Sequence, residues 1–308
     1  MALSLGIVGL PNVGKSTLFQ ALTKKEVEIA NYPFTTIDPN VGVVQVPDER
    51  LEKLAHLFHS EKVIPSIIEF VDIAGLVKGA NKGEGLGNQF LARIREVDAI
   101  CQVVRCFPSA DIINVEKTVD PLRDIDTINT ELELKDIETD KKGSSIPESE
   151  LLSKKPVLYL LNCNPGDASE ELLKQVKKSG AAYVTANLKD ELEMQELAEV
   201  ERKELGFVSQ LPELIKKSYE LLDLITFFTV VGEKEARAWA VKKGTKAPQA
   251  GGVVHGDFQE KFIKAMVIPW DKLLEVGTYA AAAAKGWLRT EGKDYVVQDG
   301  DVIEIKHG

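Results

Sequence analysis

One stretch constrains the fold of this chain more than any other, the run Gly9-Leu10-Pro11-Asn12-Val13-Gly14-Lys15-Ser16-Thr17. Its spacing, G-x-x-x-x-G-K-[ST], is that of a phosphate-binding loop. The two glycines let the backbone turn tightly, so that successive N–H groups face an anion at a helix N-terminus. Lys15 would reach the β- and γ-phosphates, and the Ser16 hydroxyl would ligate Mg²⁺. The residues expected to bind the nucleotide here are Asn12, Val13, Gly14, Lys15, Ser16 and Thr17.

The context of the loop supports this interpretation. An apolar run of strand length, residues 3–8, precedes it, and residues 16–24 have the pattern of a helix. The order strand, loop, helix is the one that a phosphate-binding loop requires.

A second motif follows another predicted strand, residues 66–72. Asp72-Ile73-Ala74-Gly75 has the D-x-x-G arrangement, in which the Asp holds Mg²⁺ through water and the Gly N–H meets the γ-phosphate. The polar segment 28–40 is where a loop would supply a Thr to Mg²⁺ and to the γ-phosphate. Thr35 and Thr36 are the candidates, and we assign this role to Thr36. Lys15, Thr36 and Gly75 are thus the expected catalytic groups.

The residue after Gly75 is unusual for such a site. Related GTPases place a Gln there to orient the attacking water, whereas this chain has Leu76. Hydrolysis is then slow, or another group, a bound cation or a partner orients the water. The basic residues that follow, Lys78, Lys82, Arg93 and Arg95, fit either a solvated switch loop or a surface that senses a partner.

The base-reading position also departs from the GTPase pattern. Asn162 ends a predicted strand where N-K-x-D would begin, and we expect it to bind the nucleotide, but Pro165 stands where the guanine-binding Asp belongs. A shifted register, Asn164 to Asp167, restores N-x-x-D without the Lys. Without that Asp, adenine becomes admissible.

The order of elements predicts an α/β fold with two domains. Strands and helices alternate through residues 1–222, which predicts a doubly wound, mostly parallel sheet with the ligand at its carboxyl edge. A short helical insertion is expected at about 120–155. Residues 223–308 mix short helices with short strands, expected at 226–231, 263–268 and 302–305, and predict a small α+β domain.

Composition sets the remaining bounds. The 308 residues are 44% hydrophobic and contain no stretch long enough to span a membrane, so we expect a cytoplasmic protein.

Cys101, Cys106 and Cys163 lack metal-ligand spacing and are expected to be free thiols. The net charge of −10 lies entirely before residue 223, because residues 223–308 hold 12 basic and 12 acidic residues. Nucleic acid would therefore bind only through a local patch, such as Lys242, Lys243 and Lys246.

Four segments together resemble the Obg-like ATPase (YchF) family: the loop at 9–16, Asn31-Tyr32-Pro33-Phe34-Thr35-Thr36-Ile37, residues 72–80, and Gly244-Thr245-Lys246-Ala247-Pro248-Gln249-Ala250. The resemblance implies hydrolysis of ATP in preference to GTP, the ribosome as partner, with rRNA or tRNA contact, and a C-terminal TGS domain beginning near Leu222. Related GTPases without the Gln use an Asn at the position of Asn12 to hold K⁺. The chain departs from the family in having a short segment where a long helical hairpin is inserted, and in having Pro165 at a Glu position.

Three functions are compatible with this sequence. The first is a slow nucleotide-hydrolysing switch on the ribosome, and the second is a nucleotide-gated RNA- or protein-binding module in which hydrolysis is incidental. The third is a metabolic kinase, which is disfavoured because no acceptor pocket can be read from the sequence.

Overall fold

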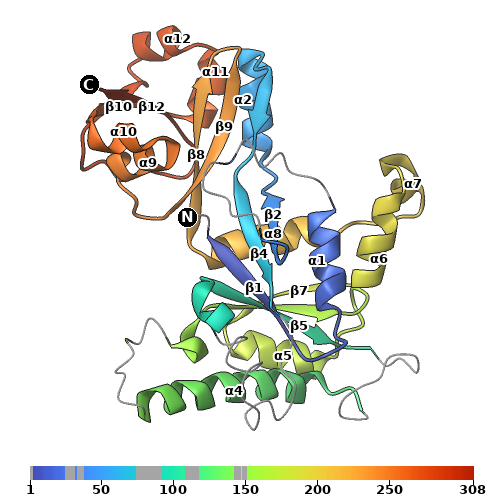
Figure 1. Ribbon diagram of the computed structural model, residues 1–308. Coiled ribbons are helices and arrows are strands. Elements are labelled where there is room, and N and C mark those ends of the chain that lie inside the picture. The colour runs from blue at the N-terminus through green and yellow to red at the C-terminus, as the bar shows by residue number, and fades with distance from the viewer. Residues whose placement is uncertain are drawn as a thin grey trace. The chain divides into compact units, whose positions relative to one another are not determined.

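The computed structural model describes residues 3–24, 32, 38–73, 92–107, 118–141, 147 and 151–308. The chain divides into two compact units, one of Met1–Val44 and Ile68–Leu222 and the other of Gln45–Ile67 and Asp223–Gly308 (Figure 1). The alternation of strands and helices predicts one domain for residues 1–222. The segment Gln45–Ile67 belongs instead to the second unit, because its apolar side chains pack into the core of that unit.

A six-stranded sheet with the order β2-β4-β1-β5-β6-β7 forms the centre of the first unit. The pairs β1/β4, β1/β5, β5/β6 and β6/β7 are parallel, which confirms the predicted mostly parallel α/β fold. Because β1 lies between β4 and β5, its carboxyl end is flanked by the carboxyl ends of both. The strands are β1 Ser4–Val8, β2 Val41–Gln45, β4 Ile67–Asp72, β5 Ala99–Arg105, β6 Val157–Asn162 and β7 Ala182–Ala186.

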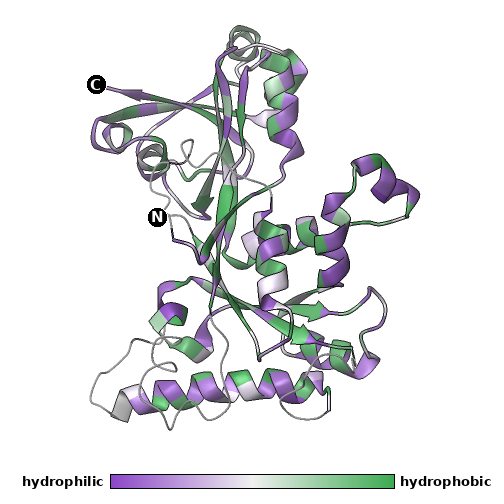
Figure 2. Cartoon of the chain, turned by 45° about the vertical axis from the view of Figure 1, so that its right-hand side comes forward, coloured by the Kyte–Doolittle hydropathy of each residue, from purple (hydrophilic) through white to green (hydrophobic). Residues whose placement is uncertain are grey.

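Helices cover both faces of this sheet. Figure 1 shows α4 and α5 on one side and α1 and α8 on the other. Apolar residues recur along α4 at helical spacing, and Ile125, Ile128 and Leu132 are buried against the sheet. Green and purple segments accordingly alternate along this helix in Figure 2. The helices are α1 Lys15–Thr23, α4 Pro121–Lys141, α5 Glu170–Lys178, α6 Leu188–Glu193, α7 Glu199–Glu204 and α8 Leu211–Leu221.

The expected insertion at about 120–155 contains, in its described residues, a long α-helix docked on the sheet and a short 3-10 helix. Helix α4 runs to Lys141, and a short 3-10 helix, η4, covers Leu152–Lys154. The carboxylate of Asp136 accepts hydrogen bonds from the backbone N–H groups of Leu152 and Ser153, each at 2.9 Å. These bonds fasten the return segment to α4.

The second unit contains a six-stranded mixed sheet with the order β11-β10-β12-β8-β9-β3. The strands expected near 226–231, 263–268 and 302–305 are present, whereas β3, β9 and β11 were not expected. In β9, alanines at 236, 238 and 240 weaken the strand signal, and pairing with β8 along eight residues compensates. The strands are β3 Lys62–Ile64, β8 Leu224–Val231, β9 Glu235–Lys242, β10 Phe262–Pro269, β11 Arg289–Glu291 and β12 Asp301–His307.

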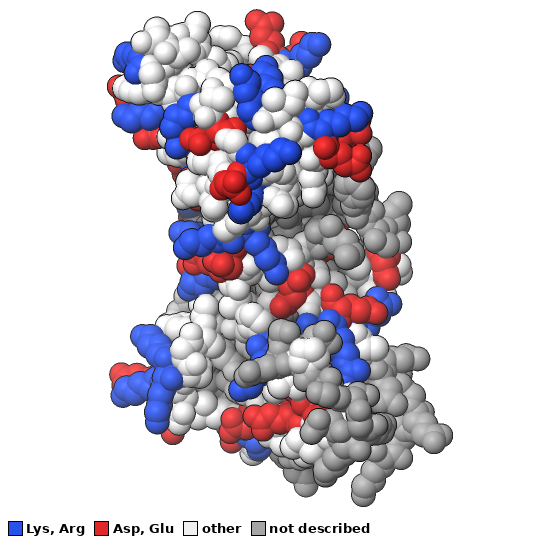
Figure 3. Space-filling view, turned by 90° about the vertical axis from the view of Figure 1, so that its left-hand side faces the viewer, with Lys and Arg blue, Asp and Glu red and all other residues white. Residues whose placement is uncertain are grey.

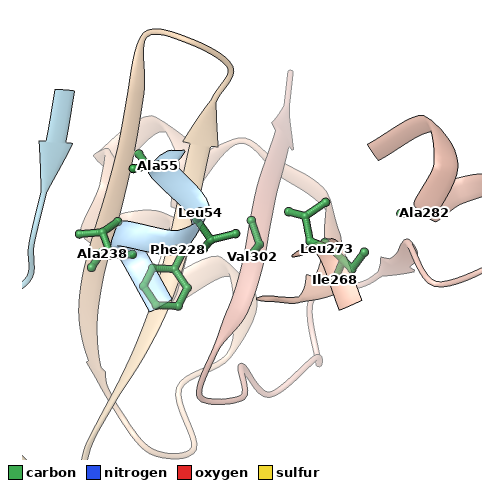
Figure 4. Packing of buried hydrophobic residues seen from close by; sticks show 10 residues of the cluster. Leu54, Ala55, Phe228, Ala238, Ile268, Leu273, Ala282 and Val302 are labelled. Atoms are coloured by element: carbon green, nitrogen blue, oxygen red, sulfur yellow. The ribbon is translucent and has the colours of Figure 1, made fainter. Parts of the chain in front are cut away.

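Each face of this second sheet has its own apolar core. One core includes Phe228, Val302 and Leu273 together with Leu51 and Leu54 of α2 (Figure 4). The other core includes Phe227, Phe262 and Ile303, with Ala247 and Ala250 of α9. The helices are α2 Glu49–Phe58, α9 Ala247–Val254, α10 Gly256–Glu260, α11 Trp270–Val276 and α12 Tyr279–Ala284.

An ion pair adds to the docking of α2 in the second unit. Asp48 caps the helix by accepting from the backbone N–H of Arg50 at 2.9 Å. The guanidinium of Arg50 in turn lies 2.7 Å from Asp48 and 2.6 Å from Asp299. Arg50 therefore joins the start of α2 to the loop before β12.

None of the helices in the described part of the chain combines the length and the apolar character that a bilayer crossing requires.

Candidate functional site

The loop between β1 and α1 has a backbone that only particular residues can adopt. Gly14 has φ +108, and a Cβ there would lie 2.7 Å from Nδ2 of Asn162. A Cβ on Gly9 would lie 2.7 Å from the carbonyl oxygen of Val103, which is backbone and cannot swing aside. Asn12 has φ +63, a left-handed conformation that Asn tolerates better than most residues. Both glycines are therefore required by close packing as well as by the turn.

Lys15, the first residue of α1, folds its side chain back over the loop. Its Nζ donates to the carbonyl oxygens of Leu10 at 2.9 Å and of Gly9 at 3.1 Å. Burial lowers the pKa of Lys15, and the nearby carboxylate of Asp72 partly opposes that shift. Burial likewise raises the pKa of Asp72, and Lys15 opposes it. Each group therefore favours the charged form of the other.

Asp72 reaches this position because of the strand order. Ile7 of β1 pairs in register with Asp72, the last residue of β4. The backbone N–H of Asp72 donates to the carbonyl oxygen of Asn40 at 2.8 Å. The loop and the acidic residue thus leave neighbouring strands at the same edge of the sheet.

Asn162, the last residue of β6, joins the phosphate-binding loop to the segment after β7. It is buried, with 6% of its surface exposed. Its Nδ2 donates to the carbonyl oxygen of Val13 at 2.9 Å, and its Oδ1 accepts from the backbone N–H of Leu188 at 3.1 Å. One amide side chain therefore fixes two loops that line the site.

A cavity of about 950 Å³ opens between these loops. Seven of the predicted nucleotide-binding residues line it, and sequence reasoning missed Phe107, Asn187 and Leu188, which line it too. The only sequence signal for Asn187 was its place between a strand and a helix, where it caps α6 by accepting from the N–H groups of Lys189 and Asp190. The predicted residues that line the cavity are Asn12, Val13, Gly14, Lys15, Ser16, Thr17 and Asn162.

The loop after β6 presents amide and carboxylate groups to this cavity. Nδ2 of Asn164 donates to the carboxylate of Asp167 at 2.9 Å, and Oδ1 of Asn164 accepts from Nδ2 of Asn187 at 2.9 Å. Asn164 and Asp167 line the cavity, whereas Pro165 does not. Of the two registers considered from the sequence, the shifted one, Asn164 to Asp167, is thus the one that places side chains at the cavity.

Two of the expected site residues, Thr36 and Gly75, lie outside the described residues, as do Thr35, Leu76, Lys78 and Lys82. In the described part of the chain no cluster of three or more His, Cys, Asp or Glu residues forms a metal-binding group. The Ser16 hydroxyl and the Asp72 carboxylate are nevertheless hard oxygen donors of the kind that Mg²⁺ takes when phosphates and water complete its coordination.

The predicted basic loop of the second unit is partly paired. Lys242 ends β9, and Nζ of Lys246 lies 2.7 Å from the carboxylate of Asp294. The backbone N–H of Lys243 donates to the carbonyl oxygen of Asp223 at 2.9 Å. Figure 3 shows basic and acidic side chains lying next to one another over the described surface of the face it draws.

This fold and site define a nucleotide-binding protein of the phosphate-loop, GTPase-like class. A parallel sheet carries the loop at the end of a central strand, a Lys faces an Asp from the neighbouring strand, and an Asn from a further strand braces the loop.

Comparison with known proteins places the chain more closely. Residues 4–162 match the family model described as "50S ribosome-binding GTPase", and residues 224–308 match the C-terminal YchF GTPase model, described as "Protein of unknown function (DUF933)". The chain is 44% identical to the ribosome-binding ATPase YchF of Bacillus subtilis and 43% identical to that of Haemophilus influenzae, with 99% of each chain covered. It also resembles the solved structure of the Schizosaccharomyces pombe YchF GTPase, with 36% identity, a TM-score of 0.85 and coverage of 99% of this chain and 97% of that one. The chain belongs to the YchF family.

The alignment with the Bacillus protein supports a missing internal segment. It extends over 364 positions, whereas this chain has 308 residues, so at least 56 positions are gaps on the side of this chain. Gaps of that total length fit the expectation that the helical insertion at about 120–155 is shortened relative to the family.

Proposed function

We propose that this protein is a slow ATP-hydrolysing switch that associates with the ribosome. The observation that carries the proposal is the braced phosphate-binding loop, in which Lys15 lies inside the turn and Asn162 holds the carbonyl of Val13. The curated relatives that match over 99% of their length are named ribosome-binding ATPases, which supports both the reaction and the partner. A ribosomal partner would place the protein in the cytoplasm.

The expected chemistry distributes charge over the triphosphate. Lys15 would neutralise the β- and γ-phosphates, and backbone N–H groups at the start of α1 would bind the remaining oxygens. Ser16, Asp72 and Thr36 would hold Mg²⁺, which offsets the charge that develops on the phosphates. The N–H of Gly75 would meet the γ-phosphate.

Slow hydrolysis follows from the residue after Gly75. Leu76 has no polar atom with which to orient water, so the water must be placed by another group. We infer that a K⁺ ion held in part by Asn12 contributes to this, and that turnover is faster in K⁺ than in Na⁺. Equal turnover rates in the two salts at matched ionic strength would rule out that role.

The choice of base follows from the loop after β6. A guanine-specific site needs a carboxylate that accepts two hydrogen bonds from the base, and Pro165 supplies none. The carboxylate of Asp167 does line the cavity, but it belongs to the shifted register, which lacks the Lys of the guanine-binding motif. We therefore infer that ATP is the preferred substrate and that GTP also binds. The relatives' names differ on this point, since the bacterial proteins are called ATPases and the solved fission-yeast structure is that of a GTPase.

Titration calorimetry of the purified chain with ATP and with GTP, both with Mg²⁺, tests this proposal directly. We expect tighter binding of ATP, and loss of binding in Lys15→Ala. A matched control is Lys189→Ala, which removes an exposed Lys from the rim of the same cavity. Equal or tighter binding of GTP would overturn the base preference, and unchanged binding in Lys15→Ala would overturn the site.

The apolar Leu76 also favours a second candidate function. In it, ATP binding gates an RNA- or protein-binding surface, and hydrolysis is incidental. The second unit would then make the contact, through a TGS-type domain and the lysines at 242, 243 and 246. Turnover measured with and without ribosomes separates the two functions, because only a switch needs ribosome-stimulated hydrolysis.

A further inference from the structure

Two cysteines lie side by side where β5 and β6 end. Arg105 pairs in register with Asn162, and the backbone N–H of the next residue, Cys106, donates to the carbonyl oxygen of Asn162 at 3.2 Å. Cys106 and Cys163 therefore directly follow the last paired position, one residue beyond the end of each strand. Paired strands lie about 4.8 Å apart, and a disulfide needs Cα atoms roughly 4.4–6.8 Å apart. The usual spacing of paired strands, which Arg105 and Asn162 share, thus falls within the Cα range that a disulfide requires.

The side chains of the two cysteines point to the same face of the sheet. Both pack in the apolar cluster that contains Val104 and Leu161, two residues before each of them, as the alternation of a strand requires. Sγ of Cys106 also donates to the carbonyl oxygen of Val104 at 3.6 Å. The third cysteine, Cys101, is an odd number of residues from Cys106, so it points to the opposite face, and it is fully buried.

The thiols of Cys106 and Cys163 influence each other's ionisation. When Cys163 ionises, the Cys106 S–H can turn from Val104 and donate to the Cys163 thiolate, which lowers the pKa of Cys163 and raises the pKa of Cys106. The carboxylates of Asp124 and Asp167 face the pair and oppose ionisation of Cys106 and of Cys163, respectively. The first ionisation of the pair is therefore directed to Cys163.

The position of the pair connects it to the nucleotide cavity. Cys163 lines that cavity between Asn162 and Asn164, and Cys106 directly precedes Phe107, which lines it from the other strand. A bond between the two sulfur atoms is about 2.05 Å long, shorter than any contact between two thiols. Its formation would therefore draw together two loops that form the wall of the cavity.

We propose that Cys106 and Cys163 are a redox-sensitive dithiol, which a peroxide oxidises to a disulfide that weakens nucleotide binding. The Cys163 thiolate attacks one oxygen of hydrogen peroxide, the O–O bond breaks, and the product is a sulfenic acid and, after protonation, one water. The thiol of Cys106 then attacks that sulfur, forms the S–S bond and releases a second water. Peroxide takes up the two electrons, and a thiol reductant returns them.

Peroxide is the fitting oxidant because of its size. Only 3% of Cys163 is exposed, so a bulky disulfide reagent cannot reach the sulfur without opening the fold. A small molecule can reach it from the cavity. A nucleotide in the cavity would block the same route and slow oxidation. At equilibrium it would also disfavour the disulfide by the same factor by which the disulfide weakens nucleotide binding.

Disulfide formation itself does not depend on the proposed function, whereas its effect on ATP does. The experiment therefore has separate readouts. The native chain is treated with hydrogen peroxide, with and without ATP and Mg²⁺, free thiols are blocked, and the peptides are mapped by mass spectrometry without reduction. We expect a crosslink between the peptides that contain Cys106 and Cys163, and slower crosslinking when ATP is present.

Calorimetry then compares the reduced protein, the oxidised protein, and the oxidised protein after dithiothreitol. We expect severalfold weaker ATP binding after oxidation and full recovery on reduction. Cys106→Ala should lose this reversible weakening, and the matched control Cys101→Ala should retain it, with thermal unfolding confirming that both variants fold. If the reduced protein does not bind ATP, the proposed function is wrong. The crosslink map then still tests whether Cys106 and Cys163 form a disulfide.

Two outcomes would overturn the proposal. One is that both thiols remain free, or pair with Cys101, after treatment that leaves the fold intact. The other is that the Cys106–Cys163 crosslink forms and ATP affinity is the same in the oxidised and reduced protein.

Discussion

Asn162 at the end of β6 donates a hydrogen bond to the carbonyl oxygen of Val13 across 149 positions of sequence, at 2.9 Å. The same side chain accepts from the backbone N–H of Leu188. Because the three groups are buried, neither backbone partner has water to replace the amide. The conformation of the phosphate-binding loop thus depends on a residue of β6, a strand far from the loop along the chain.

Asn162→Ala should therefore destabilise the protein and weaken nucleotide binding together. A buried polar group left without its partner costs about 1–3 kcal/mol. The variant leaves two such groups, the carbonyl oxygen of Val13 and the backbone N–H of Leu188. Urea unfolding measures the change in stability, and calorimetry measures the change in ATP affinity. Asn164→Ala, in the same loop but exposed, is the control and should leave the unfolding free energy within about 0.5 kcal/mol of wild type. Equal stability of the Asn162 and Asn164 variants would contradict the bracing role.

Gly14→Ala should abolish nucleotide binding. The added methyl group would lie 2.7 Å from Nδ2 of Asn162 and 3.0 Å from Leu188, in a backbone conformation that side chains rarely adopt. Gly166→Ala is a matched control, because Gly166 also has a left-handed φ of +96 but has no heavy atom within 4 Å of the added Cβ. That variant should lose only about 1–2 kcal/mol of folding stability, the cost of the strained backbone. Similar loss of ATP affinity in both variants would show that strain alone, rather than the contact with Asn162, explains the requirement for glycine.

Ser16→Ala and Asp72→Ala should raise the Mg²⁺ concentration needed for half-maximal turnover. Each variant removes an oxygen donor expected at the metal, while Lys15 remains in place to bind the phosphates. Activity is measured across a Mg²⁺ titration at fixed ATP. Thr17→Ala, which also lines the cavity but is not expected to ligate the metal, is the control. A Mg²⁺ requirement unchanged from wild type in both variants would remove the assigned metal roles.

Changing Lys242, Lys243 and Lys246 to Glu should weaken association with ribosomes and flatten its dependence on salt. Each lost phosphate contact lowers the slope of log affinity against log salt by about 0.7–0.9. The pairing of Lys246 with Asp294 reduces its share, so we expect a smaller change from that residue than from the other two. Sedimentation with ribosomes at several salt concentrations measures the effect, and ATP affinity should not change.

A charge-matched control comes from the same unit. The triple change of Lys234, Lys264 and Lys306 to Glu alters the net charge equally at other exposed positions. If both triple variants lose association to the same extent, total charge rather than the loop at 242–246 is responsible. If neither does, the basic segment around Lys78, Lys82, Arg93 and Arg95 is the next to change.

Much of the first unit could be predicted because its signals are local. The spacing of Gly9, Gly14 and Lys15 is specific to a phosphate-binding loop. Apolar runs of strand length alternate with helical patterns on either side of it. The sequence also placed Asn162 at the correct strand end. The contacts of Asn162 with Val13 and Leu188 follow from the order of the strands in the sheet. The sequence predicts a doubly wound sheet but not that order.

The second unit was harder to predict for physical reasons. The pattern of α2 shows that one face of this helix is apolar, but not that Leu51 and Leu54 are buried with Phe228, far along the chain. Strand β9 is rich in alanine, so only its pairing with β8 identifies it. The roles of Thr36 and Gly75 concern residues outside those described, and they stay predictions.

The most direct test of the central claim is ATP turnover by the purified chain and its Lys15→Ala variant, each measured with and without ribosomes in K⁺ buffer. Slow turnover by the wild-type chain that ribosomes accelerate, and none by the Lys15→Ala variant in either condition, is the predicted result. Turnover that is equal in the two proteins, or that ribosomes leave unchanged, would contradict a ribosome-associated ATP switch.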